Sequence, residues 1–183
     1  VMVLLVETAN EAVANNSTLV SAGWTAFASS PQGTGTAAGT AATRLTSYWK
    51  RHSGSESNPA LGDAGNHTGG IVMVFRGCVA SGSPIDADAG SVAASASTSV
   101  SCPTITTTGA DRMVVAAVAW STDSASAQAS AWTNANLTGL TERQDSGSTA
   151  GNGGGISVAT GVMATAGAVG ATTATLGTSS VQG

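Results

Sequence analysis

The sequence predicts an all-β protein, a single antiparallel β-sandwich of jelly-roll-like character with about nine short strands. Apolar runs of strand length alternate with clusters of Gly, Asn, Ser and Pro, which are typical of turns. Helical periodicity is almost absent. With 183 residues, the chain fits one domain, 1–183, that is long enough to bury a core.

In the first half of the chain, continuous apolar and alternating runs predict four strands. The opening run "VMVLLV" is apolar throughout, which is typical of a central strand. A helical turn is the alternative only at 7–15, and the Asn15–Asn16 pair is expected to stop it there. A loop rich in Gly and Thr is expected at 29–42. The four expected strands are 1–8, 19–28, 43–50 and 70–77.

Five further strands are expected in the second half. The run at 113–119 is apolar throughout and predicts a second central strand, whereas alternating runs indicate strands nearer the sheet edges. The stretch at 146–154, which contains "GNGGG", is expected to be a flexible hairpin connection, because no Lys and no helix follow it as in a phosphate-binding loop. The five expected strands are 91–101, 112–121, 137–145, 155–164 and 171–176.

The composition excludes several classes of function. Only 9% of the residues are charged and the net charge is −4, so the six basic residues cannot form a nucleic-acid-binding surface. No stretch approaches the roughly 20 apolar residues of a membrane-spanning helix. Apolar runs such as "IVMVF" argue against disorder in this chain, which is rich in small residues. We therefore expect a soluble protein with no nucleic-acid or membrane partner.

The two halves of the chain, 1–77 and 111–183, share one plan. Each has an apolar strand, a loop, a Trp-Thr pair, a Gly-rich loop and a further strand; the pairs are Trp24-Thr25 and Trp132-Thr133. This indicates an internal duplication, with convergent strand spacing as the alternative. The first half also has the strand "GGIVMVFRG", whose counterpart would fall just beyond Gly183. The natural polypeptide is therefore expected to continue with an apolar strand, and both termini are expected to be incomplete.

Candidate catalytic and metal-binding residues are few. A metal site is one interpretation of a polar stretch with two histidines and two carboxylates, but its spacing matches no known ligand pattern, and a solvated loop is favoured. These four residues are His52, Glu56, Asp63 and His67. No serine lies in the strand-turn-helix context of a hydrolase nucleophile. We therefore predict no enzyme, no catalytic residue, no metal and no cofactor.

Other residues have two interpretations, one as part of a binding site and one as a purely structural element. Asp86 and Asp88 resemble half of a calcium loop, but an Asp-rich turn is favoured because the closing bidentate acid is absent. Cys78 and Cys102 are expected to be partly buried free thiols, with one disulfide as the alternative. The tryptophans are expected to fill the core, with a sugar-stacking platform as the alternative. The four tryptophans are Trp24, Trp49, Trp120 and Trp132.

At "AGWTAF", "ATRLTSYWKR", "GGIVMVFRG" and "LTERQDSGSTAGNGGGISVATG" the chain resembles a group of small β-sandwich virion proteins of tailed bacteriophages. The resemblance spans nearly the whole chain and implies a non-enzymatic structural component on the virion surface. A head decoration (cement) protein is the first expectation. It would form a homo-oligomer, a trimer on a capsid three-fold site, and contact the major capsid protein. A tail or fibre component and a carbohydrate-binding adhesin are the alternatives.

Overall fold

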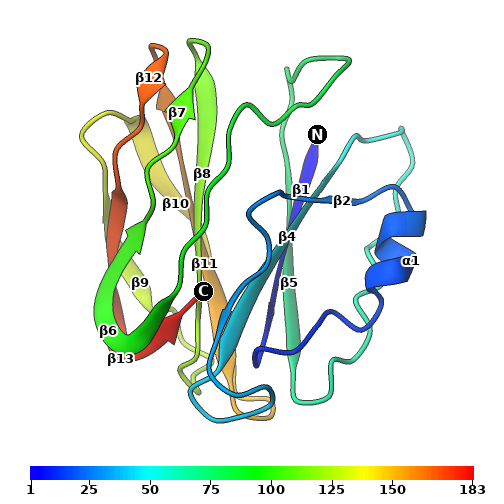
Figure 1. Cartoon of the computed structure of the whole chain (residues 1–183), viewed down its shortest axis with the longest axis vertical. Coiled ribbons are helices and arrows are strands. Elements are labelled where there is room, and N and C mark those ends of the chain that lie inside the picture. The colour runs from blue at the N-terminus through cyan, green and yellow to red at the C-terminus, as the bar shows by residue number, and fades with distance from the viewer.

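The computed structural model describes residues 1–183 and confirms the antiparallel β-sandwich (Figure 1). Thirteen strands form a five-stranded sheet, a six-stranded sheet and a small two-stranded sheet, and the chain also contains one short helix. In chain order the elements are β1 (Met2–Thr8), α1 (Asn16–Ser21), β2 (Thr25–Ala26), β3 (Gln32–Thr34), β4 (Thr43–Lys50), β5 (Thr68–Val74), β6 (Ala93–Cys102), β7 (Thr106–Thr107), β8 (Arg112–Trp120), β9 (Ala129–Thr133), β10 (Thr138–Ser148), β11 (Gly154–Met163), β12 (Gly167–Ala168) and β13 (Thr172–Gln182).

The first sheet has the order β2-β4-β1-β5, with β3 also paired to β4. Every residue of β1 is buried because the strand is covered on both faces. On one face, Leu4 and Val6 pack against Leu19 of α1. On the other face, Val3 and Leu5 pack against the second sheet. This explains why β1 is apolar throughout rather than alternating.

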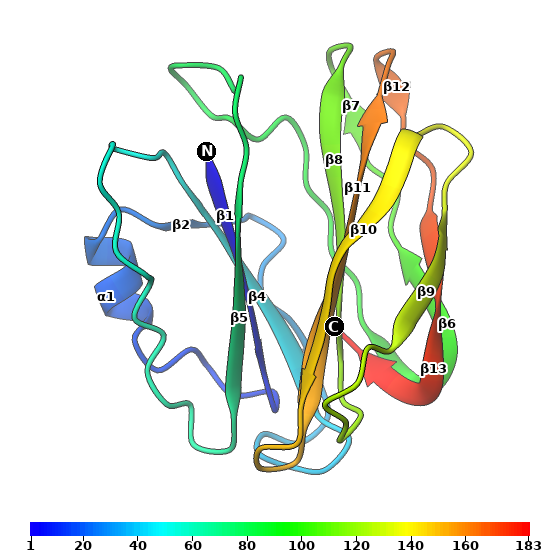
Figure 2. The same cartoon turned by 180° about the vertical axis from the view of Figure 1, so that it is seen from behind.

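The second sheet folds back on itself and so supplies two layers (Figures 1 and 2). The strands β10, β11 and β8 form the layer next to the first sheet, and β6, β13 and β9 form the outer layer. The last residues of β13 join the two layers, since Gln182 pairs with Trp120 of β8. A core between these layers is built on Val100, Val118 and Leu176.

The helix corrects the sequence-based expectation around residues 7–28. The stretch 7–15 is not helical; the helix begins at Asn16 and is followed by a two-residue strand. Its end explains the error. Gly23 has a φ of 89°, and the Trp24 N–H donates to the Leu19 carbonyl. This is a glycine-terminated helix end that places Trp24 in the core, and not the start of a strand.

The expected strand at 43–50 coincides with β4, and the other remaining expected strands lie within a few residues of observed ones, except that β13 continues to Gln182, well past the expected end at 176. Four short strands were not predicted: β3, β7, β9 and β12. The expected loop at 146–154 is correct as a hairpin connection, although β10 extends to Ser148 and β11 begins at Gly154. No helix in the structure has both the length and the hydropathy that are needed to cross a membrane.

The two halves pair their first strands in the same way. Met2 of β1 lies opposite Lys50 of β4, and Met113 of β8 lies opposite Val162 of β11. The strands that follow the Trp-Thr pairs differ, because β2 pairs with β4 whereas β9 pairs with β13 in the outer layer. Internal duplication therefore stays a prediction. The strand pairing that the two halves have in common is that of β1 with β4 and of β8 with β11.

Candidate functional site

A buried histidine and a buried carboxylate meet at one end of the first sheet. His67, just before β5, places Nε2 2.8 Å from Oε2 of Glu7 on β1. The other carboxylate oxygen accepts a hydrogen bond of 3.0 Å from the Thr43 hydroxyl of β4. The exposure of the two ionisable side chains is 3% and 2%. The expectation of a solvated loop is therefore wrong for His67.

Both ring nitrogens of His67 have acceptor partners. Nδ1 lies 3.0 Å from Asn66 Oδ1, and that same oxygen accepts the Asn152 N–H at 2.7 Å. Because Asn66 Oδ1 and the Glu7 carboxylate both accept, the imidazolium form of His67 satisfies every contact. In that form neither ring nitrogen has a lone pair for a metal or for proton abstraction. The arrangement acts as a polar clamp between β1, β4, β5 and the β10–β11 turn.

Electrostatics favour a proton on this pair. Burial raises the pKa of the Glu7 carboxyl, while the hydrogen bonds from His67 and Thr43 oppose that shift. The hydrogen bond to Glu7 raises the pKa of His67, against the effect of burial. Because both pKa values are raised, the folded protein holds its proton more tightly than the unfolded chain does.

The cluster requires the glycine beside it. A Cβ on Gly154 would lie 2.6 Å from Glu7 Oε1 and 2.8 Å from His67 Nε2, and the residue has a φ of 151°. Glycine therefore lets β11 approach the buried pair closely. A cavity of about 320 Å³ adjoins the pair and is lined largely by glycine and polar residues.

The other members of the expected polar cluster lie apart. His52 is exposed, and its Nδ1 accepts the Gly54 N–H; Glu56 pairs with Lys50 at 2.6 Å. Asp63 accepts the Gly65 N–H in a local turn. No three His, Cys, Asp or Glu side chains form a group able to hold a metal ion.

The two aspartates of "PIDADAG" diverge and anchor the long connection between β5 and β6. Asp88 accepts the Ser29 N–H at 2.7 Å. Asp86 accepts the Thr108 N–H at 2.9 Å and pairs with Arg112 at 3.1 Å. These contacts lower the pKa of Asp86, the Thr108 hydroxyl having the largest effect. These carboxylates therefore make long-range anchoring contacts in place of the local Asp-rich turn expected from the sequence, and the two do not converge on one site.

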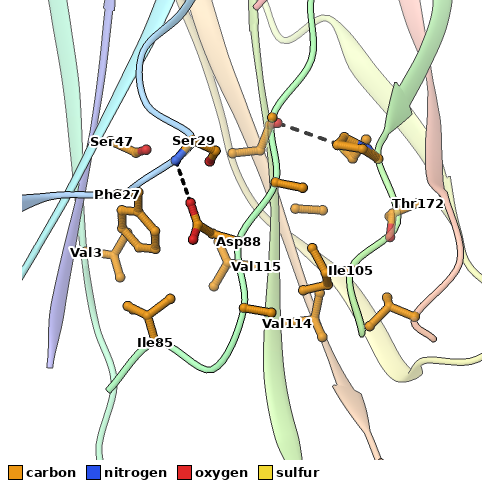
Figure 3. Close-up of a pocket in the computed structure, with 18 of the residues that line it drawn as sticks. Val3, Phe27, Ser29, Ser47, Ile85, Asp88, Ile105, Val114, Val115 and Thr172 are labelled. Carbon is orange, nitrogen blue, oxygen red and sulfur yellow. Dashed lines mark hydrogen bonds between the residues drawn. The ribbon is translucent and has the colours of Figure 1, made fainter. Parts of the chain in front are cut away.

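A mostly apolar groove of about 810 Å³ lies beside the free edge of β8 (Figure 3). One wall is formed by the first sheet and the residues after β2, and carries Val3 and Phe27. The other wall comes from β8 and the segment after β6, and carries Val114 and Ile105. The connection between β5 and β6 crosses the groove, with Ile85 directed inward. Sequence patterns gave no sign of this groove, because its walls come from segments far apart in the chain.

The tryptophans divide into two pairs. Trp24 is 5% exposed and Trp120 is fully buried, as expected for core residues. Trp49 and Trp132 are only half-buried, and Trp132 Nε1 donates to Glu142 Oε2 at 3.0 Å. The expectation that all four fill the core is therefore only half right.

Both cysteines are free thiols, as favoured from the sequence. Cys78 is exposed rather than partly buried. Burial raises the pKa of the Cys102 thiol to about 11, and this thiol lies 3.6 Å from the Ala117 carbonyl oxygen.

No protein-family model matches the chain, and no curated protein or solved structure shows significant similarity to it. The class that the fold defines is an antiparallel β-sandwich-like protein with one small helix.

Proposed function

We propose that the chain is a non-enzymatic structural protein of a tailed-bacteriophage particle, a head decoration (cement) protein on the virion surface. The proposal rests mainly on the outer layer of the second sheet. Its three strands, β6, β9 and β13, contain no charged residue. A solvent-facing sheet normally carries many charges, because they keep proteins soluble and separate. An uncharged sheet instead suits a surface that is covered by neighbouring copies.

The edge strand β6 strengthens this argument. It is ten residues long and pairs with β13 on one side only. Natural proteins usually protect such edges with charges, Pro or a short strand, because an open edge can pair with another chain. β6 has none of these devices, and its exposed side chains are small: Ala94, Ser95, Ala96, Thr98, Ser99 and Ser101.

A face of hydroxyl and methyl groups makes contacts that are weak individually. Repetition on a symmetric shell turns such contacts into a stable layer, since attached neighbours have a high effective concentration. The expected partners are further copies of the chain, as a trimer on a three-fold site, and the major capsid protein. The resemblance to phage virion proteins supports the same assignment.

The first test locates the protein on purified particles by immunogold electron microscopy with antibody against this chain. Label over the head is expected. Label confined to the tail or its tip would favour a tail or fibre component. Absence of label from every particle would overturn the virion assignment.

A second test probes the outer layer directly. Ser95→Lys places a charge on the exposed face of β6, and Ser55→Lys places the same charge on an exposed loop. We expect Ser95→Lys to lower the occupancy of particles about tenfold, equivalent to roughly 1.4 kcal/mol of lost binding. Ser55→Lys should leave occupancy unchanged. Equal behaviour of the two variants would contradict an interface at β6.

A carbohydrate-binding adhesin is the second candidate, because Trp132 is half-buried beside Glu142. Aromatic faces with adjacent hydrogen-bonding groups can stack on sugar rings. A glycan array with the wild-type chain and a Trp132→Ala variant tests this candidate. Saccharide binding that is lost in Trp132→Ala would favour the adhesin over the decoration protein.

A further inference from the structure

One edge of β8 is almost unpaired. Along its other edge β8 pairs with β11 over its whole length, from Trp120 opposite Gly155 to Arg112 opposite Met163. On the free edge, only the end of the strand is engaged: Gly183 and Ala119 exchange two backbone hydrogen bonds of 2.9 and 3.0 Å. These bonds are the beginning of an antiparallel ladder.

The direction of the remaining backbone groups follows from this pair. In an extended strand, alternate residues direct N–H and C=O to the same edge, so Ala117 and Val115 share the orientation of Ala119. The Cys102 thiol confirms it for Ala117, whose carbonyl oxygen it approaches at 3.6 Å. No strand pairs with β8 on this edge before Ala119. A row of backbone donors and acceptors therefore faces the apolar groove.

Both walls of the groove carry apolar side chains, among polar ones such as Ser29 and Asp88. Val3 and Leu5 line it from the first sheet, and Val100 lines it from the outer layer. Three of the six large hydrophobic side chains that are exposed also line it: Val79 (55% exposed), Val92 (45%) and Met113 (50%). Exposed apolar side chains gathered at one hollow indicate that something covers them.

The first sheet shows what such an edge accommodates. There β1 is paired on both edges, by β4 and by β5, and Thr68 at the start of β5 lies opposite Thr8. In the second sheet, β8 has β11 on one edge, and Gly183 lies opposite Ala119 on the other. Gly183 thus stands where the counterpart of β5 would begin, running in the same antiparallel sense.

We propose that the groove receives an apolar strand that follows Gly183 in the same polypeptide and runs antiparallel to β8. The hydrogen bonds of Gly183 set its register: the first added residue lies opposite Val118 and the second opposite Ala117. Successive side chains point alternately to the first sheet and to the outer layer. Apolar side chains lie on both sides of this path, Val3 and Leu5 on the first sheet and Val100 on the outer layer, so the strand is apolar at nearly every position rather than at every second one.

The most direct test is to read the coding sequence beyond the Gly183 codon. The proposal requires at least five further residues that are largely apolar, without Pro at the second and fourth positions. Those two residues must donate to the carbonyls of Ala117 and Val115. A stop codon after Gly183, or a charged or Pro-rich continuation, overturns the proposal.

A fusion tests the site itself. Residues 69–74, "GGIVMV", are repeated directly after Gly183, so that the added strand imitates β5. The matched control has Pro at the second and fourth added positions and therefore lacks the two N–H groups. We expect the fused strand to slow amide exchange at Ala117 and Val115 about tenfold and to raise Tm by roughly 5 °C, and the Pro control to do neither.

Two outcomes of the fusion experiment would contradict the proposal. Equal effects of the fused strand and its Pro control, including no effect of either, would show that β8 does not accept a strand in this register. Slow exchange that appears only when the oligomeric state rises above that of the unfused chain would assign the groove to the strand of a second copy. Neither outcome depends on whether the protein decorates a virion.

Discussion

The indole N–H of Trp120 donates a hydrogen bond of 3.1 Å to the Ser157 hydroxyl across the β8–β11 pair. Ser157 in turn donates to Asp145 Oδ1 at 2.6 Å, and both side chains of the first hydrogen bond are fully buried. Asp145 Oδ2 accepts the Gln128 N–H at 2.8 Å at the start of β9. One hydroxyl therefore connects the fully buried Trp120 side chain to the turn that leads into the outer layer.

Ser157→Ala should destabilise the fold by about 1–3 kcal/mol, because it leaves the buried Trp120 N–H without an acceptor. Ser95→Ala is the matched control, since Ser95 is exposed on β6. Urea unfolding followed by tryptophan fluorescence measures both. A Ser157→Ala variant as stable as the control would show that the hydrogen bond contributes nothing.

Gly155→Ala should destabilise the fold by about 1–3 kcal/mol, because a Cβ there overlaps the Trp120 ring and the Ser146 carbonyl oxygen. Gly69→Ala provides the comparison: it also lies in a strand, but a Cβ there meets nothing within 4 Å. Thermal unfolding of the two variants gives the difference. Equal Tm values would mean that β11 adjusts to the added methyl group at no cost.

Trp24→Ala should cost roughly 3–5 kcal/mol, because Trp24 packs with Leu4 and Tyr48 in the core under α1. Trp132→Ala should cost clearly less, since Trp132 is half-exposed. Chemical denaturation with circular dichroism detection compares the two variants. A Trp24→Ala protein of near-native stability would argue against its role as a core side chain.

The His67 clamp should make stability depend on pH. The pKa of His67 is raised in the folded state, so the stabilisation is complete below the unfolded value of about 6.5 and is lost as the pH rises through the folded pKa. Stability should fall by up to about 1.4 kcal/mol per pH unit in that window.

Tm measured between pH 6 and 9 tests this expectation. The wild-type protein and a His52→Gln control, altered at the exposed histidine, should both lose Tm as the pH rises. A His67→Gln variant should be less stable at pH 6 and should lose much of this dependence. A wild-type Tm that stays constant or increases over the range would contradict the assigned direction.

The parts of the fold that could be predicted from sequence are those with a local signal. The apolar runs of β1 and β8 indicated central strands; β1 is buried along its whole length, whereas β8 is fully buried only at its end, and Met113 near its start is 50% exposed. The strands β7, β9 and β12 have two to five residues of mainly small side chains, and such segments carry no periodicity.

The buried clamp illustrates why the rest was missed. Glu7 and His67 are separated by 60 positions, and the spacing around His67 alone resembles a polar loop. The available signal was Glu7 itself, because a carboxylate in a strand that is otherwise apolar throughout needs a buried partner. The groove had no local signal at all, since it exists only where segments distant in sequence meet.

The layer formed by β8 and β11 has one further consequence. Val115 and Ala117 face the core shared with the first sheet, while Val114 and Val118 face the outer layer. Loss of this layer would expose the core shared with the first sheet and the core under the outer layer at once, which couples the two sheets. The molecule should therefore unfold in a single all-or-none transition, with equal calorimetric and van't Hoff enthalpies, despite being built as three stacked layers of strands.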